Sequence, residues 1–270
     1  MFHAQRLDRE HLVEIAAHGF DTVEVYATRT HFDYHDPSAA TALAEWLDDT
    51  RLGMNSVHAP TTAGYQGGRW GETLSIASAD EARRLHAVAE TIAALSIASV
   101  VPFRSLVLHL GVPSNEAAAN NRAAAARSLE TIGEAAEAVG VSLAIELIPN
   151  ALSLPARLVQ WIEDDVELPG MGVCLDVGHA NLAGDPMEAV ELCSGHIITT
   201  HLHDNRGKRD DHLVPGEGGI DWDGVLLAFQ KVGYDGAWIF ELAPAADGPA
   251  VLARAARARE KFERLLQFEQ

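Results

Sequence analysis

Seven segments of strand character alternate with helical segments, and this alternation limits most strongly what the chain can fold into. The strand segments are short apolar runs, whereas the helical segments are longer and carry apolar residues three or four apart. The predicted strands span residues 21–27, 53–59, 103–111, 141–148, 171–178, 196–204 and 237–242. Apolar strands separated by helices are typical of a parallel sheet that is buried on both faces. The order predicts an α/β fold made of repeated βα units.

The predicted helices begin and end at residues that favour helix boundaries. Asp8 and Asp221 are suitable N-caps, Gly19 ends the first helix, and Ser78 and Glu81 have the spacing of a capping box. The helices span residues 8–20, 36–50, 78–95, 113–140, 154–165, 185–195, 221–233 and 247–267. A helix therefore precedes the first clear strand, and a closed barrel needs one more strand before that helix.

The fold that these units predict is a single (β/α)8 TIM barrel with a short, weak first strand. Residues 2–7 (FHAQRL) are the candidate for that strand, although they are few and polar. No shift in composition and no Pro-, Gly- or Ser-rich linker divides the chain, so we expect one domain over residues 1–270. The alternative is an open doubly wound sheet, which is less favoured because no glycine-rich phosphate loop follows the first strand.

Residues that can bind a metal stand where the predicted strands end. In a TIM barrel the carboxyl-terminal ends of the strands form one rim, and catalysis takes place there. The polar loop after strand 196–204 adds two more such residues. The full set is His58, His109, Glu146, Asp176, His179, His201, Asp210, His212 and Glu241. One glutamate after a strand is often only a solvated rim residue, but this many coincidences predict one polar site.

The charge of the chain argues against large anionic partners. The 20 Lys and Arg residues against 39 Asp and Glu residues give a net charge of −19, which disfavours nucleic acid and anionic membranes. No apolar run reaches the roughly 18 residues of a membrane span. The amino-terminal residues lack the apolar stretch of a signal peptide. Cys174 and Cys193 lie in apolar segments and fit free thiols, so we expect a cytoplasmic protein.

Several longer motifs give the chain a family resemblance. They are ELIPN, CLDVGHANLAG, HLHDNRG followed by DDHLVPGEGGIDW, and YDGAWIFEL. Together they resemble the xylose isomerase-like TIM-barrel superfamily and, within it, the sugar phosphate isomerase/epimerase branch. The resemblance covers nearly the whole chain, from GFDTVEV to the last helix.

This resemblance implies one divalent metal ion, held by carboxylates and a histidine from separate strand ends. The residues carried over are Glu146, Asp176, His201 and Glu241. Three carboxylates and one imidazole suit Mn²⁺, Zn²⁺, Mg²⁺ or Co²⁺. His201 and His203 share a strand face. The family places its ligand three residues before an acidic residue, here Asp204, and this match selects His201.

The implied activity is isomerisation or epimerisation of a sugar or sugar phosphate, by proton transfer through a metal-bound enediolate. Glu146 and Glu241 come from opposite strands, so we expect them to be the catalytic pair; which one removes the proton stays open. The expected substrate-binding residues are His179, His203, Arg206 and Trp70. A homodimer that pairs through rim helices also stays open.

Two other activities stay open on the same residues. Endonuclease IV shares this barrel and cleaves abasic DNA with a cluster of metals. Its larger ligand set would include His58, His109, His179, Asp210 and His212, with two or three ions per chain. Against this, no aromatic residue follows HAP directly, the next strand ends in HLG in place of His-Pro-Gly, and the chain is acidic. His58 and His109 fit equally well as imidazoles that hydrogen-bond a ligand carboxylate. An inosose dehydratase-like lyase would use the same residues as the isomerase.

Overall fold

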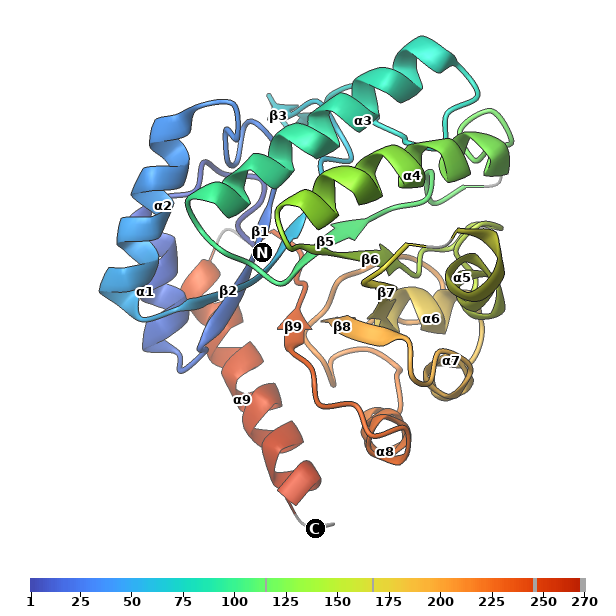
Figure 1. Cartoon of the computed structure of the whole chain (residues 1–270). Coiled ribbons are helices and arrows are strands. Elements are labelled where there is room, and N and C mark those ends of the chain that lie inside the picture. The colour runs from blue at the N-terminus through green and yellow to red at the C-terminus, as the bar shows by residue number, and fades with distance from the viewer. Residues whose placement is uncertain (115, 167, 245–246, 268–270) are drawn as a thin grey trace.

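Seven parallel strands form the central sheet, and their order in space follows their order along the chain. The structure, a computed structural model, describes residues 1–114, 116–166, 168–244 and 247–267. The strands are β1 (Thr22–Tyr26), β2 (Gly53–His58), β5 (Ser105–Leu108), β6 (Ser142–Glu146), β7 (Met171–Asp176), β8 (Ile197–Leu202) and β9 (Trp238–Phe240). Each strand pairs in parallel with the next, and the sheet curls into a nearly closed barrel (Figure 1). The predicted α/β TIM-barrel fold is confirmed.

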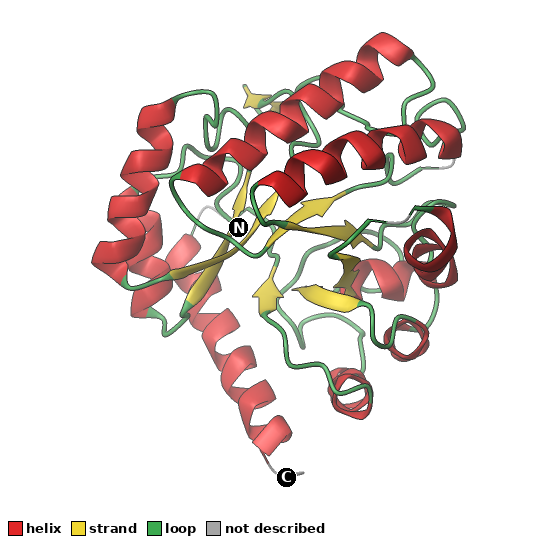
Figure 2. Cartoon of the chain, viewed as in Figure 1, coloured by secondary structure: helices red, strands yellow, loops and turns green. Residues whose placement is uncertain are grey.

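Helices surround this sheet on its outside (Figure 2). They are α1 (Arg9–Ala17), α2 (Pro37–Thr50), α3 (Glu81–Leu95), α4 (Arg122–Ala138), α5 (Pro155–Gln160), α6 (Val177–Ala183), α7 (Pro186–Leu192), α8 (Trp222–Lys231) and α9 (Gly248–Gln267). Their apolar faces pack toward the sheet, where Leu43, Leu129 and Phe229 are fully buried. In the described part of the chain, no helix combines the length and the apolar character that crossing a membrane requires.

Aspartate side chains set several of the helix starts. The carboxylates of Asp8 and Asp221 cap α1 and α8, as predicted. The cap predicted at Ser78 is wrong, because α3 begins at Glu81 and its N-cap is Asp80. The Asp80 carboxylate accepts a hydrogen bond from a backbone N–H of the first turn. Aspartate caps a helix as well as serine does, so the sequence pattern could not separate the two positions.

The predicted eighth strand is wrong, because residues 2–7 form turns and bends and not a strand. The backbone N–H of Leu7 bonds to the carbonyl of His31 in the loop after β1, so the segment is held by a loop and not by a neighbouring strand. Among the described residues β1 and β9 are not paired with each other. Residues 1–3 line the largely apolar space at this seam, together with side chains of both strands.

Three further segments differ from the sequence predictions. The helix predicted over residues 113–140 begins only after Asn121, whose side chain caps it. A short hairpin of β3 (Tyr65–Gln66) and β4 (Arg69–Trp70) forms a separate two-stranded sheet in the loop after β2. Helix α6 follows β7 with no intervening loop, because Asp176 is both the last residue of the strand and the N-cap of the helix.

Strand register brings the carboxyl-terminal ends of the strands to one level. Asp176 is aligned with His201 across β7 and β8, and Glu146 is aligned with Cys174 across β6 and β7. Since side chains alternate along a strand, residues two positions apart share the inner face of the barrel. Two residues before the polar strand ends lies an apolar cluster of Val107, Ala144 and Cys174. The layer beneath the polar mouth is therefore apolar at these three strands, whereas Ser56 and Thr199, two residues before His58 and His201, make it polar on the other side.

Candidate metal and active site

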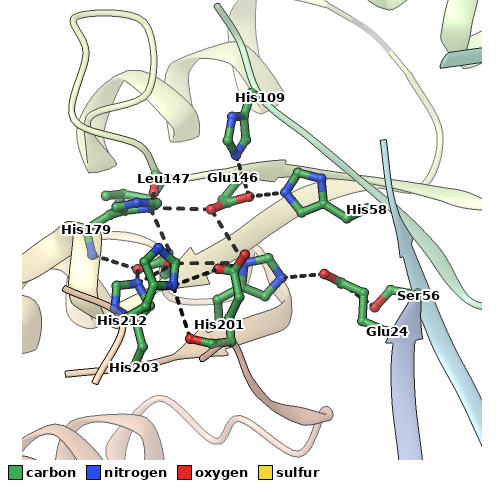
Figure 3. Close-up of polar contacts among 12 residues, drawn as sticks. Glu24, Ser56, His58, His109, Glu146, Leu147, His179, His201, His203 and His212 are labelled. Atoms are coloured by element: carbon green, nitrogen blue, oxygen red, sulfur yellow. Dashed lines mark hydrogen bonds and ion pairs between the residues drawn. The ribbon is translucent and has the colours of Figure 1, made fainter. Parts of the chain in front are cut away.

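The polar residues predicted at the strand ends converge in the mouth of the barrel (Figure 3). They form three groups, and within each group the ligand atoms lie within 4.8 Å of one another. The central group is Glu146, Asp176, His201 and Glu241; the second is His58, His109 and Glu146; the third is His179, His203, Asp210 and His212. The structure thus brings together every residue that the sequence placed at the metal site.

Glu146, the last residue of β6, links two of these groups. Its side chain is 1% exposed, and each of its carboxylate oxygens faces two histidines. Oε2 lies 3.1 Å from Nε2 of His58 and 2.9 Å from Nε2 of His109. Oε1 lies 3.3 Å from Nδ1 of His179 and 3.4 Å from Nδ1 of His201. Histidines from β2, α6, β8 and the loop after β5 therefore point toward this one carboxylate (Figure 3).

His201, in β8, points one ring nitrogen at three carboxylates. Its Nδ1 lies 3.2 Å from Oε2 of Glu241, 3.4 Å from Glu146 and 3.8 Å from Asp176. Within the described residues, neither this Nδ1 nor Oε2 of Glu241 has a hydrogen-bond partner, although both atoms are buried. Buried polar atoms without partners are rare and costly, so this pair requires an explanation.

The other ring nitrogen of His201 bonds to Glu24, a residue that the sequence analysis missed. Nε2 lies 3.0 Å from Oε1 of Glu24 in β1, and Oε2 of Glu24 accepts a 2.6 Å hydrogen bond from Ser56 in β2. A signal was present in the motif DTVEVYA, where alternation puts Glu24 on the face opposite Val23 and Val25. A carboxylate on the inner face of a buried strand needs such a partner.

His203 orients Asp176 from a fully buried position. Its Nε2 lies 3.0 Å from the Asp176 carboxylate, and its ring stacks on that of His212 with centroids 3.8 Å apart. A Cβ at Gly178 would lie 2.0 Å from the His203 ring, so the DVGH motif requires glycine there. His203 is not among the residues that line the cavity described below.

The polar loop after β8 brings Asp210 and His212 to the site. Oδ2 of Asp210 lies 3.1 Å from Nε2 of His179 and 3.0 Å from Nε2 of His212. Nδ1 of His179 lies 3.0 Å from the carbonyl of Leu147, and Nδ1 of His212 lies 3.1 Å from the carbonyl of Glu241. Because Nδ1 of each ring bonds to the backbone, Nε2 is the atom that faces the carboxylate.

Opposite charges set the protonation of the site. Burial would raise the pKa of Glu146 and of Glu241, but the charge of His201 and of the other nearby histidines outweighs burial and holds both pKa values well below the ordinary range. Burial would lower the pKa of His212, and the charge of Glu241 does most to overcome it and raise that pKa to about 9. Burial would likewise lower the pKa of His179, but the negative charge of Asp176 and the contacts with Asp210 and Glu146 outweigh burial and raise that pKa well above its ordinary value. Glu146 and Glu241 are therefore ionised near neutral pH, and His179 and His212 are protonated.

A cavity of about 440 Å³ opens onto this cluster. Small-molecule sites usually have volumes of about 300–1,000 Å³. Glu146, Glu241 and His179 lie on its wall, and so does Trp70 from the β3–β4 hairpin. Arg206 does not line the cavity; its side chain is 64% exposed on the loop after β8.

Asp204 anchors the loop that carries Asp210 and His212. Its fully buried carboxylate accepts hydrogen bonds from backbone N–H groups and one indole N–H. The donors are Asn205, Gly216, Gly219, Ile220 and the side chain of Trp222. A Cβ at Gly218 would lie 2.2 Å from Oδ1 of Asp204, so the loop closes around the carboxylate only with glycine there.

We expect Asp204→Ala to lower the free energy of unfolding by about 3 kcal/mol or more, since each buried donor left without an acceptor costs about 1–3 kcal/mol. Denaturant unfolding followed by circular dichroism measures this change. Asp221→Ala, which removes only the N-cap of α8, is the control and should cost about 1 kcal/mol. If Asp204→Ala cost no more than this control, Asp204 would not be the anchor of the loop.

Comparison with known proteins places these features in a family. The xylose isomerase-like TIM barrel family model matches residues 12–267. The chain belongs to the xylose isomerase-like TIM barrel family. The resemblance found in the sequence motifs is therefore confirmed, and the match includes all the strands of this xylose isomerase-like barrel.

Individual relatives are similar to this xylose isomerase-like chain over different lengths. Uncharacterized protein MJ1311 of Methanocaldococcus jannaschii is 32% identical over 236 residues, which are 83% of this chain and 75% of the relative. The ketose 3-epimerase of Arthrobacter globiformis is 25% identical over 127 residues, which are 46% of this chain and 41% of the epimerase. A solved D-tagatose 3-epimerase-like protein has a TM-score of 0.78 and 29% identity, over 96% of each chain.

Proposed function

We propose that the protein is a divalent-metal-dependent isomerase or epimerase of a sugar or sugar phosphate. The observation that carries the proposal is the convergence of Glu146, Asp176, His201 and Glu241. Glu146 and Glu241 also line a cavity with room for a small substrate. The names of two similar proteins, a ketose 3-epimerase and a D-tagatose 3-epimerase-like protein, support the same substrate class.

The central group fits a divalent cation by its donor chemistry. Three carboxylates and one imidazole suit Mn²⁺, Zn²⁺, Mg²⁺ or Co²⁺. Nδ1 of His201 and Oε2 of Glu241 lie 3.2 Å apart, and neither has a hydrogen-bond partner in the described residues. A cation between them would satisfy both atoms. We propose one ion per chain, which would polarise a substrate carbonyl and neutralise the negative charge that develops beside it.

Glu241 is better placed than Glu146 to remove the substrate proton. The Glu241 side chain is 17% exposed on the cavity wall, and its Oε2 faces the central group, which leaves Oε1 for the substrate. Glu146 is 1% exposed, and both of its oxygens face histidines. A general base needs an oxygen within reach of the proton. We propose that Glu241 takes the proton from the carbon beside the carbonyl, which leaves an enediolate.

The face to which the proton returns decides the product. A proton returned to the same carbon from the Glu146 side gives the epimer, whereas a proton returned by Glu241 to the neighbouring carbon gives the isomer. His179 and Trp70 lie on the cavity wall, where an imidazole N–H can hydrogen-bond a sugar hydroxyl and an indole can pack on the sugar ring. These two residues would orient the substrate.

A multinuclear metal site is the second candidate, and the histidines of the second and third groups (the outer groups) favour it. His58, His179 and His212 each bond Nδ1 to a backbone carbonyl and turn Nε2 toward a carboxylate. Metal-binding histidines commonly have this arrangement. Two or three ions would fit an endonuclease IV-like phosphodiesterase on abasic DNA, although the net charge of −19 disfavours DNA. An inosose dehydratase-like lyase would need only the central group.

The metal content of the Asp210→Ala variant separates these candidates. Asp210 belongs only to the third group. If one ion binds at the central group, we expect the Asp210→Ala variant to hold as much metal per chain as the parent. Elemental analysis after gel filtration measures it. Asp211→Ala, at the neighbouring residue, is the control because Asp211 is in none of the convergent groups. Loss of an ion in Asp210→Ala alone would instead indicate a multinuclear site.

The proposed activity is tested on a panel of free and phosphorylated ketoses and aldoses. The protein is loaded with Mn²⁺ or Co²⁺, and the products are separated by chromatography. We expect an epimer or isomer of at least one sugar, formed only while the metal is present and lost after chelation. Cleavage of abasic DNA by the loaded, folded protein, without turnover of any sugar, would replace the proposal by the nuclease.

A further inference from the structure

We propose that Glu24 is a positioning residue that fixes the tautomer of His201, so that Nδ1 of this ring carries the lone pair that faces the metal. The proposal rests on the function proposed above, because it concerns the central metal group. It goes beyond that function by giving a role to a residue outside all three convergent groups.

The contacts of Glu24 determine which nitrogen of His201 carries the hydrogen. Oε1 of Glu24 lies 3.0 Å from Nε2 of His201. Oε2 of Glu24 accepts a 2.6 Å hydrogen bond from the hydroxyl of Ser56, which holds the carboxylate in place. An ionised carboxylate only accepts hydrogen bonds, so Nε2 of His201 must be the donor. A neutral imidazole with its hydrogen on Nε2 has its free lone pair on Nδ1.

His201 needs a side-chain partner because its ring is oriented in the opposite sense to those of the outer histidines. His58 and His212 bond Nδ1 to a backbone carbonyl and present Nε2. His179 also presents Nε2, to Asp210, although its Nδ1 lies 3.3 Å from Glu146 as well as near the Leu147 carbonyl. In His201 it is Nδ1 that points at Glu146 (Figure 3). The same Nδ1 faces Asp176 and Glu241. Nδ1 of His201 therefore faces the central group, and a hydrogen-bond partner that orients the ring must bond to Nε2. Glu24, on β1, supplies that partner across the barrel.

Two other roles for Glu24 fit the contacts less well. As a metal ligand, Glu24 would need a ligand atom within one of the convergent groups, and it has none there. Both of its oxygens are already engaged, by His201 and by Ser56. As a purely structural residue, Glu24 would stabilise the barrel without affecting how the metal is bound. Two measurements separate this last role from positioning: the affinity for the metal, and the nitrogen of His201 on which the hydrogen is found.

The experiment titrates Co²⁺ into the metal-free parent and its variants by calorimetry. We expect Glu24→Ala to bind Co²⁺ about 10- to 100-fold more weakly, as is usual when the partner of a metal-binding histidine is removed. Glu24→Gln keeps an oxygen that can accept from Nε2, so it should recover most of this loss. Thr22→Val, on the same strand, is the control and should stay within about twofold of the parent.

A second measurement reports directly which nitrogen of His201 carries the hydrogen. In long-range ¹H–¹⁵N spectra of the zinc-loaded parent, the His201 hydrogen should be found on Nε2 and protected from solvent. In Glu24→Ala the signal of this N–H should exchange rapidly with water. A structural role alone would leave both the protection and the Co²⁺ affinity unchanged.

Failure of this proposal and failure of the proposed function look different. A parent protein that binds no Co²⁺ would overturn the metal site and the role of Glu24 together. A parent that binds Co²⁺, with a Glu24→Ala variant that binds within about twofold of it, would overturn only the role of Glu24. If Glu24→Ala did not fold, Ser56→Ala would replace it, since that change removes the hydroxyl that holds the carboxylate and leaves Asn55, its other partner, bonded to Thr199. We expect at least about a threefold loss of Co²⁺ affinity there, and an unchanged affinity would contradict the proposal.

Discussion

Glu241→Gln should lower kcat on the sugar substrate by roughly 10²- to 10⁴-fold, the usual contribution of a general acid–base group. The amide keeps the shape of the carboxylate but cannot take up a proton. Glu241 lies on the cavity wall with its side chain 17% exposed, whereas Glu146 is 1% exposed and both of its oxygens face histidines, so Glu241 is the better placed of the two. Steady-state kinetics on the metal-loaded variant, together with a circular dichroism spectrum, measures the effect.

The control for Glu241→Gln is the same change at Glu217. Glu217 lies in the loop that Asp204 anchors, where it forms an ion pair with Arg254 at 2.8 Å. Glu217→Gln should leave kcat within about twofold of the parent, since a surface ion pair is worth about 1 kcal/mol or less. A kcat near that of the parent in Glu241→Gln would remove Glu241 from proton transfer and leave Glu146 as the base.

Glu146→Ala should lose both the bound metal and the turnover. Its carboxylate belongs to two of the three convergent groups, so neither group stays complete without it. We expect the metal affinity to fall by more than roughly 100-fold, the upper end of what loss of an outer partner costs. Elemental analysis after extensive dialysis measures the metal that remains per chain, and the sugar assay measures turnover on the same sample.

Glu146→Gln keeps the volume of the side chain and separates loss of the ligand from damage to the packing. This variant should fold like the parent and still bind the metal poorly, because a neutral amide oxygen is a weaker ligand than a carboxylate. A Glu146→Ala protein that kept a full metal ion per chain would show that the ion lies outside the central group.

The strands were predictable because buried parallel strands leave a strong pattern in the sequence. Runs such as LAIE and GVCLD are apolar and end in a polar residue, and both lie in strands. Residues 2–7 have strand-like length, but no local pattern shows whether a segment finds a partner, and these residues bond to a loop. The start of α6 was hidden because Asp176 serves both a strand and a helix, and the sequence pattern assigned it only to the strand.

The predicted ligand set meets in space because each of its residues stands at or near a strand end, which is a local feature. Glu24 does not stand at a strand end. Strand alternation puts it on the inner face, but its role depends on His201, 177 residues away in sequence. The position of His203 could not be predicted either. Alternation puts its side chain on the same face as that of His201, but only the packing against Gly178 shows that it faces Asp176.

Deuterium incorporation tests the proposed proton transfer most directly. The metal-loaded protein is incubated with each sugar of the panel in D₂O, and the products are examined by NMR. Proton removal by Glu241 and return from the Glu146 side predicts an epimer with one deuterium on the carbon that gained the proton, and no such product after chelation or in Glu241→Gln. An epimer that carries no deuterium, or an unchanged rate after chelation, would contradict it.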